Sequence, residues 1–241
     1  MSDTDHSHTP SGIAARLRKG HRANYLQDWV YGGIDGAVTT FAIVAGSLGA
    51  SLSAKIILIL GFANLLADGL SMAAGNYLGT KADNDDADRL RAVEAEHIAH
   101  YPEGEREEIR QIFAAKGFEG AALENAVDTI TSNREVWIST MLAEEYGVGS
   151  ARRSPMQAAL ATFGGFLVCG LVPLVPFLLV WPNAGWVALG ATALTFAGIG
   201  FGKSRWSLSP WWRSSLETLA IGLSAAIVAF GIGHVLNGVF A

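Results

Sequence analysis

The sequence predicts an all-α integral membrane protein with five transmembrane helices and a helical insert between the second and the third. Half of its 241 residues are hydrophobic and the mean hydropathy is +0.30, which is too apolar for a soluble domain with 16% charged residues. Five stretches are long and apolar enough to cross a bilayer, for which a helix needs about 20 residues. The acidic residues gather in the one long polar segment between these stretches.

The five apolar stretches end near aromatic residues. They are residues 29–52, 56–78, 156–180, 186–201 with their flanks, and 216–240. A short turn joins the first two, so we expect them to form an antiparallel hairpin. Tryptophans at the ends of spans are typical anchors in the membrane interface. Here they are Trp181, Trp186, Trp206, Trp211 and Trp212.

The basic residues indicate which side of the membrane each loop occupies. They precede the first span, precede the third, and fill the loop between the fourth and fifth: Arg16, Arg18, Lys19, Arg22, Arg152, Arg153, Lys203, Arg205 and Arg213. With five spans all of them fall on one side, which the positive-inside rule makes cytoplasmic, with the C-terminus outside. We expect residues 1–24 to be a disordered cytoplasmic tail, in which His6 and His8 bind metal at most loosely.

The insert between the second and third spans is strongly acidic. Residues 81–150 hold sixteen of the 22 acidic residues and seven of the 17 basic ones, so this segment carries a formal charge of −9 and the rest of the chain +4. Such a block repels nucleic acid and attracts cations. Helical patterns cover residues 83–100, 103–116, 121–130 and 134–146, with Pro102 as a helix start and Gly117 as a stop.

We therefore expect four parts along the chain. Residues 1–24 form the tail, 25–80 the first two spans, 81–152 a cytoplasmic acidic helical insert, and 153–241 the last three spans. The single cysteine, Cys169, lies in an apolar run, which excludes a disulfide framework and a cysteine-rich metal site.

Ionisable residues inside the spans are functional candidates, because each costs at least about 2.5–3.5 kcal/mol to insert. Asp35 lies in the first span among Gly32, Gly33 and Gly36, small residues that let another helix approach the carboxylate closely. Glu217 and His234 in the last span are weaker candidates. We expect Glu217 to lie at the interface and His234 to be a hydrogen-bonded polar residue, with a role in proton exchange as the alternative.

The second span carries a polar stripe on one helix face. Four side chains follow one another at intervals of four residues: Asn64, Asp68, Met72 and Asn76. Oxygen ligands beside a soft thioether suit a borderline ion such as Fe²⁺ better than Mg²⁺ or Ca²⁺. The structural alternative is that the polar groups hydrogen-bond between helices and that Met72 only fills the core.

These residues resemble the vacuolar iron transporter family over nearly the whole chain from Tyr25. The resemblance rests on Asp35-Gly36 in the first span, the run Ser71-Met72-Ala73-Ala74-Gly75 in the second, the acidic helical insert, and three further spans. It implies a homodimer with five spans per subunit that exports Fe²⁺, and sometimes Mn²⁺, in exchange for protons. An aspartate and a methionine line the family's translocation path, and they match Asp35 and Met72.

The resemblance also implies metal ligands in the insert. The family binds metal there through glutamates and a methionine, and the matching positions are Glu94, Glu105, Glu108, Met141 and Glu144. The spacing of three in Glu94/His97, Glu105/Glu108 and Met141/Glu144 places each pair on one helix face. Solvated acidic faces are the structural alternative.

Two positions depart from the family pattern. His97 stands where many members have a glutamate, which keeps a ligand and predicts loading that is more sensitive to pH near neutrality. Asn64 stands where eukaryotic members carry a glutamate in the membrane, and Asp68, one turn later, is the candidate to supply that charge.

We expect a transporter without enzymatic activity or prosthetic group, whose partners are the transported metal, protons, lipid and a second copy of the chain. The predicted location is a bacterial inner membrane. One rival hypothesis is a di-iron ferroxidase built on Glu94 and His97, although a second Glu-x-x-His pair is missing. The other is a membrane scaffold whose acidic insert recruits a basic partner, which leaves Asp35 and Asp68 without a role.

Overall fold

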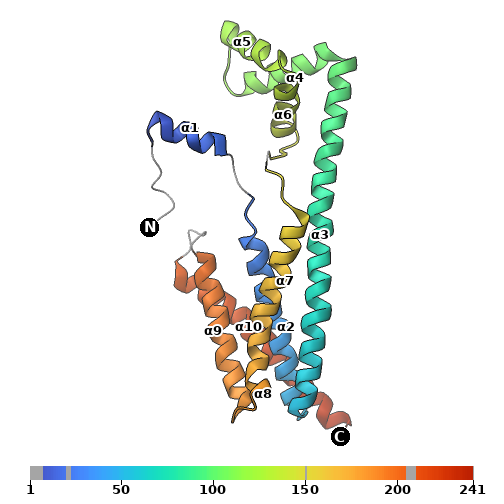
Figure 1. The fold of residues 1–241 in the computed structure, drawn as a ribbon, viewed down its shortest axis with the longest axis vertical. Helices are drawn as coiled ribbons and strands as arrows, with labels where there is room; N and C mark the ends of the chain where they lie inside the picture. The colour runs from blue at the N-terminus through green and yellow to red at the C-terminus, as the bar shows by residue number, and fades with distance from the viewer. Residues whose placement is uncertain (1–7, 20–22, 150, 205–209, 241) are drawn as a thin grey trace. The chain divides into compact units, whose positions relative to one another are not determined.

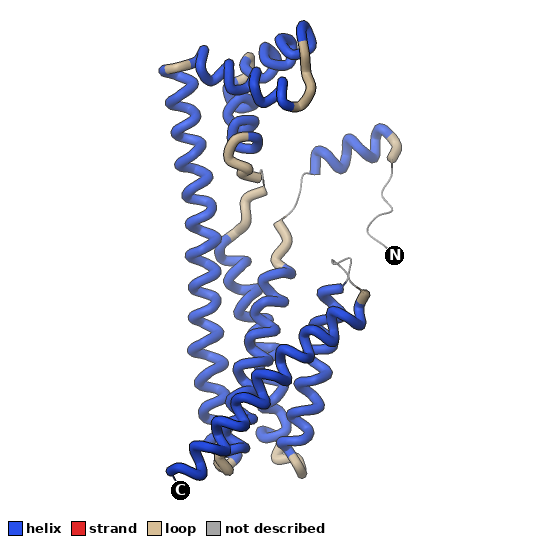
Figure 2. Tube along the Cα trace, turned by 180° about the vertical axis from the view of Figure 1, so that it is seen from behind, coloured by secondary structure: helices blue, strands red, loops and turns tan. Residues whose placement is uncertain are grey.

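The computed structural model describes residues 8–19, 23–149, 151–204 and 210–240. These residues form helices joined by turns and short loops, without a β-strand among them (Figure 2). The chain divides into two compact units. The membrane unit comprises Asn24–Gly79 and Pro155–Ala241. The other unit comprises Met1–Ala23 and Thr80–Ser154. We call Thr80–Ser154 the insert. His6, Arg22, Arg205 and Trp206 lie outside the described residues.

Five helical segments of the described chain are long and apolar enough to cross a membrane, which confirms the predicted spans (Figure 1). Four of them contain α2 (Leu26–Gly49), α3 (Ala54–His100), α9 (Ala184–Ser204) and α10 (Trp211–Phe240). The remaining span is interrupted, since α7 (Pro155–Leu171) is followed by the 3₁₀ turn η1 (Val172–Leu174) and by α8 (Val175–Leu178). Pro173 and Pro176 explain the interruption, because proline lacks the N–H that a continuous helix requires.

Glycines allow α2 and α7 to pack with their backbones in close approach. A Cβ on Gly32 would lie 2.1 Å from the carbonyl oxygen of Thr162, and one on Gly165 would lie 2.1 Å from that of Trp29. As the sequence predicts, the small residues around Asp35 therefore admit a neighbouring helix. α2 also packs against α9 and α10.

Helix α3 is continuous over 47 residues, whereas the sequence predicts a span that ends at Leu78 and a separate insert helix from Asp83. Residues 80–100 contain neither proline nor glycine, so nothing in the sequence ends the helix. The isolated Gly79 costs about 1 kcal/mol relative to alanine, which a helix of this length tolerates.

The insert continues with α4 (Pro102–Ala115), α5 (Gly120–Thr131) and α6 (Arg134–Glu144), close to the predicted ranges. Gly117 takes a φ of +91° at the end of α4, a conformation that favours glycine. Asn133 caps α6, since its side chain accepts from the backbone N–H groups of Glu135 and Val136. The core of the insert is formed by Ile109, Val127, Trp137 and Met141.

The prediction of a fully disordered tail is wrong for Pro10–Lys19, which form helix α1. The backbone N–H of Gly12 donates to the Thr9 hydroxyl at 3.2 Å, and Pro10 occupies the first helical position, where its missing N–H costs no hydrogen bond. A cap, a favourable first residue and a run of alanine and basic residues together explain the helix.

Candidate metal centre

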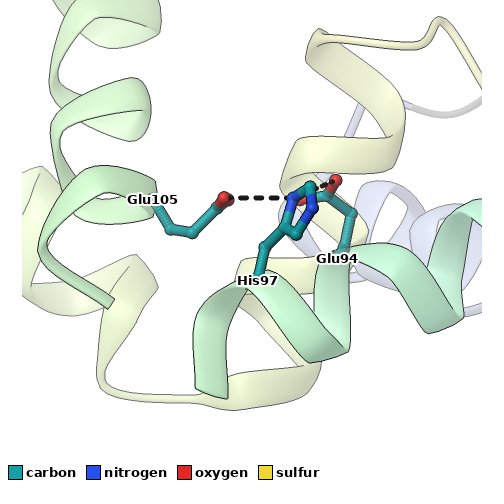
Figure 3. A group of neighbouring side chains, drawn as sticks. All are labelled: Glu94, His97 and Glu105. Carbon is teal, nitrogen blue, oxygen red and sulfur yellow. Dashed lines mark ion pairs between the residues drawn. The ribbon is translucent and has the colours of Figure 1, made fainter. Parts of the chain in front are cut away.

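The turn between α3 and α4 brings three predicted metal ligands together. Glu94 and His97 lie near the end of α3, and Glu105 lies in the first turn of α4, just after Pro102 redirects the chain. One ligand atom from each residue lies within 4.8 Å of the other two. Figure 3 shows the His97 ring between the carboxylates, with Nδ1 at 3.4 Å from Glu105 Oε1 and 3.9 Å from Glu94 Oε1.

Both carboxylates of this group are buried. Glu94 is 1% exposed and Glu105 5% exposed, and Oε2 of each has no hydrogen-bond partner among the described residues. A buried carboxylate without compensation costs several kcal/mol, so this arrangement favours a bound cation. Two carboxylates and an imidazole suit Fe²⁺, Mn²⁺ or Zn²⁺ better than Mg²⁺ or Ca²⁺.

The surrounding charges act on Glu105. The pKa of this carboxyl is raised to about 7, first by burial and then by the nearby charges of Glu108 and Glu94, against the lowering effect of His97. Glu108 itself is exposed, but its charge reaches the group. The negative charge held in this small volume is therefore large enough to retain a proton near neutral pH, and a divalent cation would replace that proton.

Two further residues interact with this group, one by a hydrogen bond and one through charge, and neither was predicted from the sequence. The Tyr146 hydroxyl donates a hydrogen bond to Glu94 Oε1 at 2.9 Å. The pKa of Glu145 is raised, first by burial and then by the charges of Glu94 and Glu108. Glu145 lies four residues after Met141 and Glu144 lies three after it. Both spacings place a residue on the same helix face as Met141, so the spacing could have indicated Glu145 as well as Glu144.

Glu144 and Met141, the further ligands that the resemblance implies, make other contacts in the structure. Glu144 forms an ion pair with Lys116, at 2.6 Å between Oε2 and Nζ. Met141 is fully buried in the core of the insert, packed with Ile109 and Trp137.

Several other acidic residues of the insert face arginines. Arg110 binds Glu107 and Glu124, and Arg106 binds Asp128. Arg91 and Arg152 form further pairs with Glu135 and Asp88. These pairs are largely exposed and each contributes little to stability. They differ from Glu94 and Glu105, which pair with the imidazole of His97.

In the membrane unit, Asp35 and Asp68 are half-buried and close enough for the charge of Asp68 to act on Asp35. One turn away, the Asn64 amide donates to the Thr39 hydroxyl at 3.3 Å, and that hydroxyl donates to the Asp35 carbonyl oxygen at 2.9 Å. Three of the predicted residues thus meet between α2 and α3. Met72 packs beside the apolar core around Phe166.

Asn76, at the end of the polar stripe, joins three helices. Its side-chain nitrogen lies 2.9 Å from Asp28 Oδ1, 2.7 Å from Thr162 Oγ1 and 3.3 Å from the Ala158 carbonyl oxygen. Asp28 is a buried carboxylate that the sequence analysis missed, because the first span was predicted to begin at Trp29. The helix begins at Leu26 instead, so Asp28 lies in its first turn.

The weaker candidates of the last span lie apart from these groups. Glu217 is exposed, with Oε2 at 3.8 Å from Lys203 Nζ. The His234 ring stacks on Phe230, with ring centroids 6.4 Å apart.

Five spans, carboxylates buried between them and a helical insert with a candidate cation site define an integral, multi-pass membrane protein of the ion-handling class. The chain belongs to the VIT family, whose model matches residues 26–234. This confirms the resemblance drawn from the sequence.

Three curated relatives align over most of the chain. A vacuolar iron transporter of Toxoplasma gondii (strain ATCC 50861 / VEG) is 33% identical, over 89% of this chain and 75% of that protein. Vacuolar iron transporter 1 of Arabidopsis thaliana is 30% identical, over 88% and 86%. A vacuolar iron transporter of Centaurea cyanus is 32% identical, over 86% of each.

Proposed function

We propose that this protein exports Fe²⁺, and Mn²⁺ as a second substrate, from the cytosol across a membrane in exchange for protons. The observation that carries the proposal is the Glu94/His97/Glu105 group, whose two buried carboxylates each have an oxygen without a hydrogen-bond partner among the described residues. The names of the curated relatives, which are vacuolar iron transporters, support iron as the substrate.

The insert collects the ion in this proposal. Glu94, His97 and Glu105 hold it, with Glu108 and Glu145 adding negative charge nearby. The acidic surface raises the local concentration of divalent cations, since the insert carries most of the acidic residues of the chain. Glu144 and Met141 are not among the proposed ligands, because Glu144 pairs with Lys116 and Met141 lies in the core of the insert.

The carboxylates of the spans pass the ion through the membrane. Asp35 and Asp68 interact electrostatically. Asn64 and Met72 offer further metal-ligand atoms on the same face of α3 as Asp68. A divalent cation between two carboxylates relieves their repulsion, and protons that arrive from the opposite side compete for the same oxygens. Binding of metal and binding of protons are then mutually exclusive, which is the basis of exchange.

A homodimer is part of the proposal. The face of α3 beside the polar stripe carries exposed small residues at intervals of four: Ala63, Ala67, Ser71 and Gly75. A Cβ on Gly75 would meet nothing within 4 Å in the described chain. Small residues at this spacing let two helices approach closely in a bilayer, so we assign this face to the contact between subunits.

The assigned location is a bacterial inner membrane, with the tail (1–24) and the metal-binding insert (81–152) in the cytosol and the C-terminus outside. The spans then occupy 25–80 and 153–241. Basic residues at Arg152, Arg153, Lys203 and Arg213 support this orientation by the positive-inside rule.

Transport into proteoliposomes tests the proposal. Fe²⁺ is supplied outside the liposomes under anaerobic conditions. An imposed pH gradient is expected to drive its uptake, and Asp35→Asn is expected to abolish that uptake. Glu94→Gln combined with Glu105→Gln is expected to reduce uptake mainly at low metal. Glu107→Gln is the matched control, because Glu107 lies on the same helix but is exposed and paired with Arg110.

Uptake by Asp35→Asn at the wild-type rate would show that Asp35 has no part in the mechanism. A rate of uptake that does not depend on the pH gradient would show that transport is not coupled to protons. The same preparation separates the rival hypotheses. A ferroxidase would consume oxygen rapidly after anaerobic loading with Fe²⁺, and a scaffold would carry no ion at all.

A further inference from the structure

We propose that helix α1 is an interfacial anchor that binds anionic phospholipid headgroups. The proposal requires only that the chain spans a membrane, and it is independent of the transported substrate. The helix runs from its Thr9 cap to Lys19.

The charge of α1 has one sign. Pro10–Lys19 contain three basic residues and no acidic residue, in a chain whose net charge is −5. Arg16 and Arg18 are exposed. On a helical wheel they fall on either side of Leu17, about 100° away from it in each direction. Long arginine side chains in these positions reach headgroups while the helix lies flat on the lipid.

An apolar edge lies between the two arginines. Ile13 and Leu17 are four residues apart and share one face, and Leu17 is 72% exposed. A leucine flanked by arginines on an exposed helix is the pattern of a helix that inserts a narrow apolar edge below the headgroups.

The chain itself holds α1 close to the bilayer. α1 ends at Lys19 and the first span begins at Leu26. Even when fully extended, this connection reaches no further than about 25 Å. A weak intrinsic affinity for lipid is therefore sufficient, because the tether keeps the local concentration of headgroups high.

The acidic insert is the other anionic surface of this chain, and the observations favour lipid over it. Arginines of the insert already face many of its carboxylates, including Glu135, Asp128 and Glu124. A bilayer binds the arginines at its headgroups and the leucine in the apolar layer directly below them, so one surface accommodates both parts of the helix.

Site-directed fluorescence on the full chain in liposomes tests the proposal. Leu17→Cys carries an environment-sensitive fluorophore on the apolar edge, and Ala15→Cys carries it on the opposite face as the matched control. Cys169 is buried, and the labelling of the wild-type chain gives its background. The liposomes contain phosphatidylcholine alone or phosphatidylcholine with phosphatidylglycerol.

With phosphatidylglycerol, the label at position 17 is expected to shift to the blue and to be quenched by lipids that carry a shallow spin label, while the label at 15 stays in water. Adding Arg16→Gln and Arg18→Gln is expected to weaken the association roughly thirtyfold, since each basic residue near an anionic surface contributes about a factor of five. A label at 17 that remains in water in both lipids would overturn the proposal. A blue shift of the label at position 17 that persists without anionic lipid would also overturn the proposal, because it would instead place α1 on the acidic insert.

Discussion

The Tyr146 hydroxyl donates a hydrogen bond of 2.9 Å to Glu94 Oε1, and Glu94 Oε2 is left without a partner among the described residues. The two oxygens of one buried carboxylate thus have different roles. One is held by the phenol that follows α6, and the other is available to a cation. This contact fixes the orientation of Glu94 from a segment distant in sequence.

Tyr146→Phe is therefore expected to weaken metal binding at the insert by about 10- to 100-fold, the usual cost of losing a group that orients a ligand. Mn²⁺ titration calorimetry on the full chain in detergent measures it, in an Asp35→Asn background that removes one of the two carboxylates of the proposed membrane site. Tyr101→Phe is the control, because Tyr101 is 71% exposed. Equal affinities for Tyr146→Phe and the parent would show that Glu94 does not need this contact.

The raised pKa of Glu105 makes the metal-free insert less stable as the pH rises. The folded-state pKa is about 7 and the ordinary value is 4.5, so the folded form binds more protons between these values. Stability is then highest below about pH 4.5 for this group and is lost progressively up to about pH 7. Glu145 shifts in the same direction and adds to the effect.

Hydrogen exchange of the α4 amides in metal-free protein measures this prediction. Protection is expected to fall between pH 5 and about pH 8 after correction for the intrinsic rate, and Glu105→Gln is expected to flatten the profile. Glu107→Gln serves as the control, because hydrogen bonds from Gln111 and Arg110 lower the pKa of Glu107, in the direction opposite to that of Glu105. A wild-type profile that rises with pH would contradict the assigned sign.

The sequence was sufficient for the features that depend on local patterns. Five apolar stretches, the proline that starts α4 and the glycine that ends it all follow from composition and spacing. The end of the second span did not, because hydropathy falls after Leu78 although the helix continues. A fall in hydropathy marks the end of the apolar part of a helix and not the end of the helix.

The metal-binding candidates show a similar limit. Glu94 and Glu105 were expected from the family resemblance and His97 from its spacing of three after Glu94, and the turn before α4 brings the three together. Tyr146 was not, since its contact depends on how the chain folds back after α6. Asp28 was missed for another reason, because a span boundary drawn three residues late left it outside the membrane.

The contact between α2 and α7 predicts a sharp difference between two adjacent glycines. A Cβ on Gly165 would lie 2.1 Å from the Trp29 carbonyl oxygen, whereas one on Gly164 would meet nothing within 4 Å in the described chain. Gly165→Ala must push the helices apart, and we expect a loss of about 1–3 kcal/mol or more. Thermal unfolding in detergent measures it. Gly164→Ala is expected to be neutral or slightly stabilising, and a similar loss for both would mean that the helices do not pack in this way.

Glu145 and Glu144 offer the sharpest comparison between the structural and the family-based assignments. Each glutamine substitution removes one negative charge from the end of α6 or the residue after it. Glu145→Gln is expected to weaken Mn²⁺ binding about tenfold or more, because the charges of Glu94 and Glu108 act on Glu145. Glu144→Gln loses only its partly exposed pair with Lys116, so the affinity is expected to change less than about twofold. Calorimetry in the Asp35→Asn background decides between them, since the reverse order of effects would restore Glu144 as the ligand and exclude Glu145.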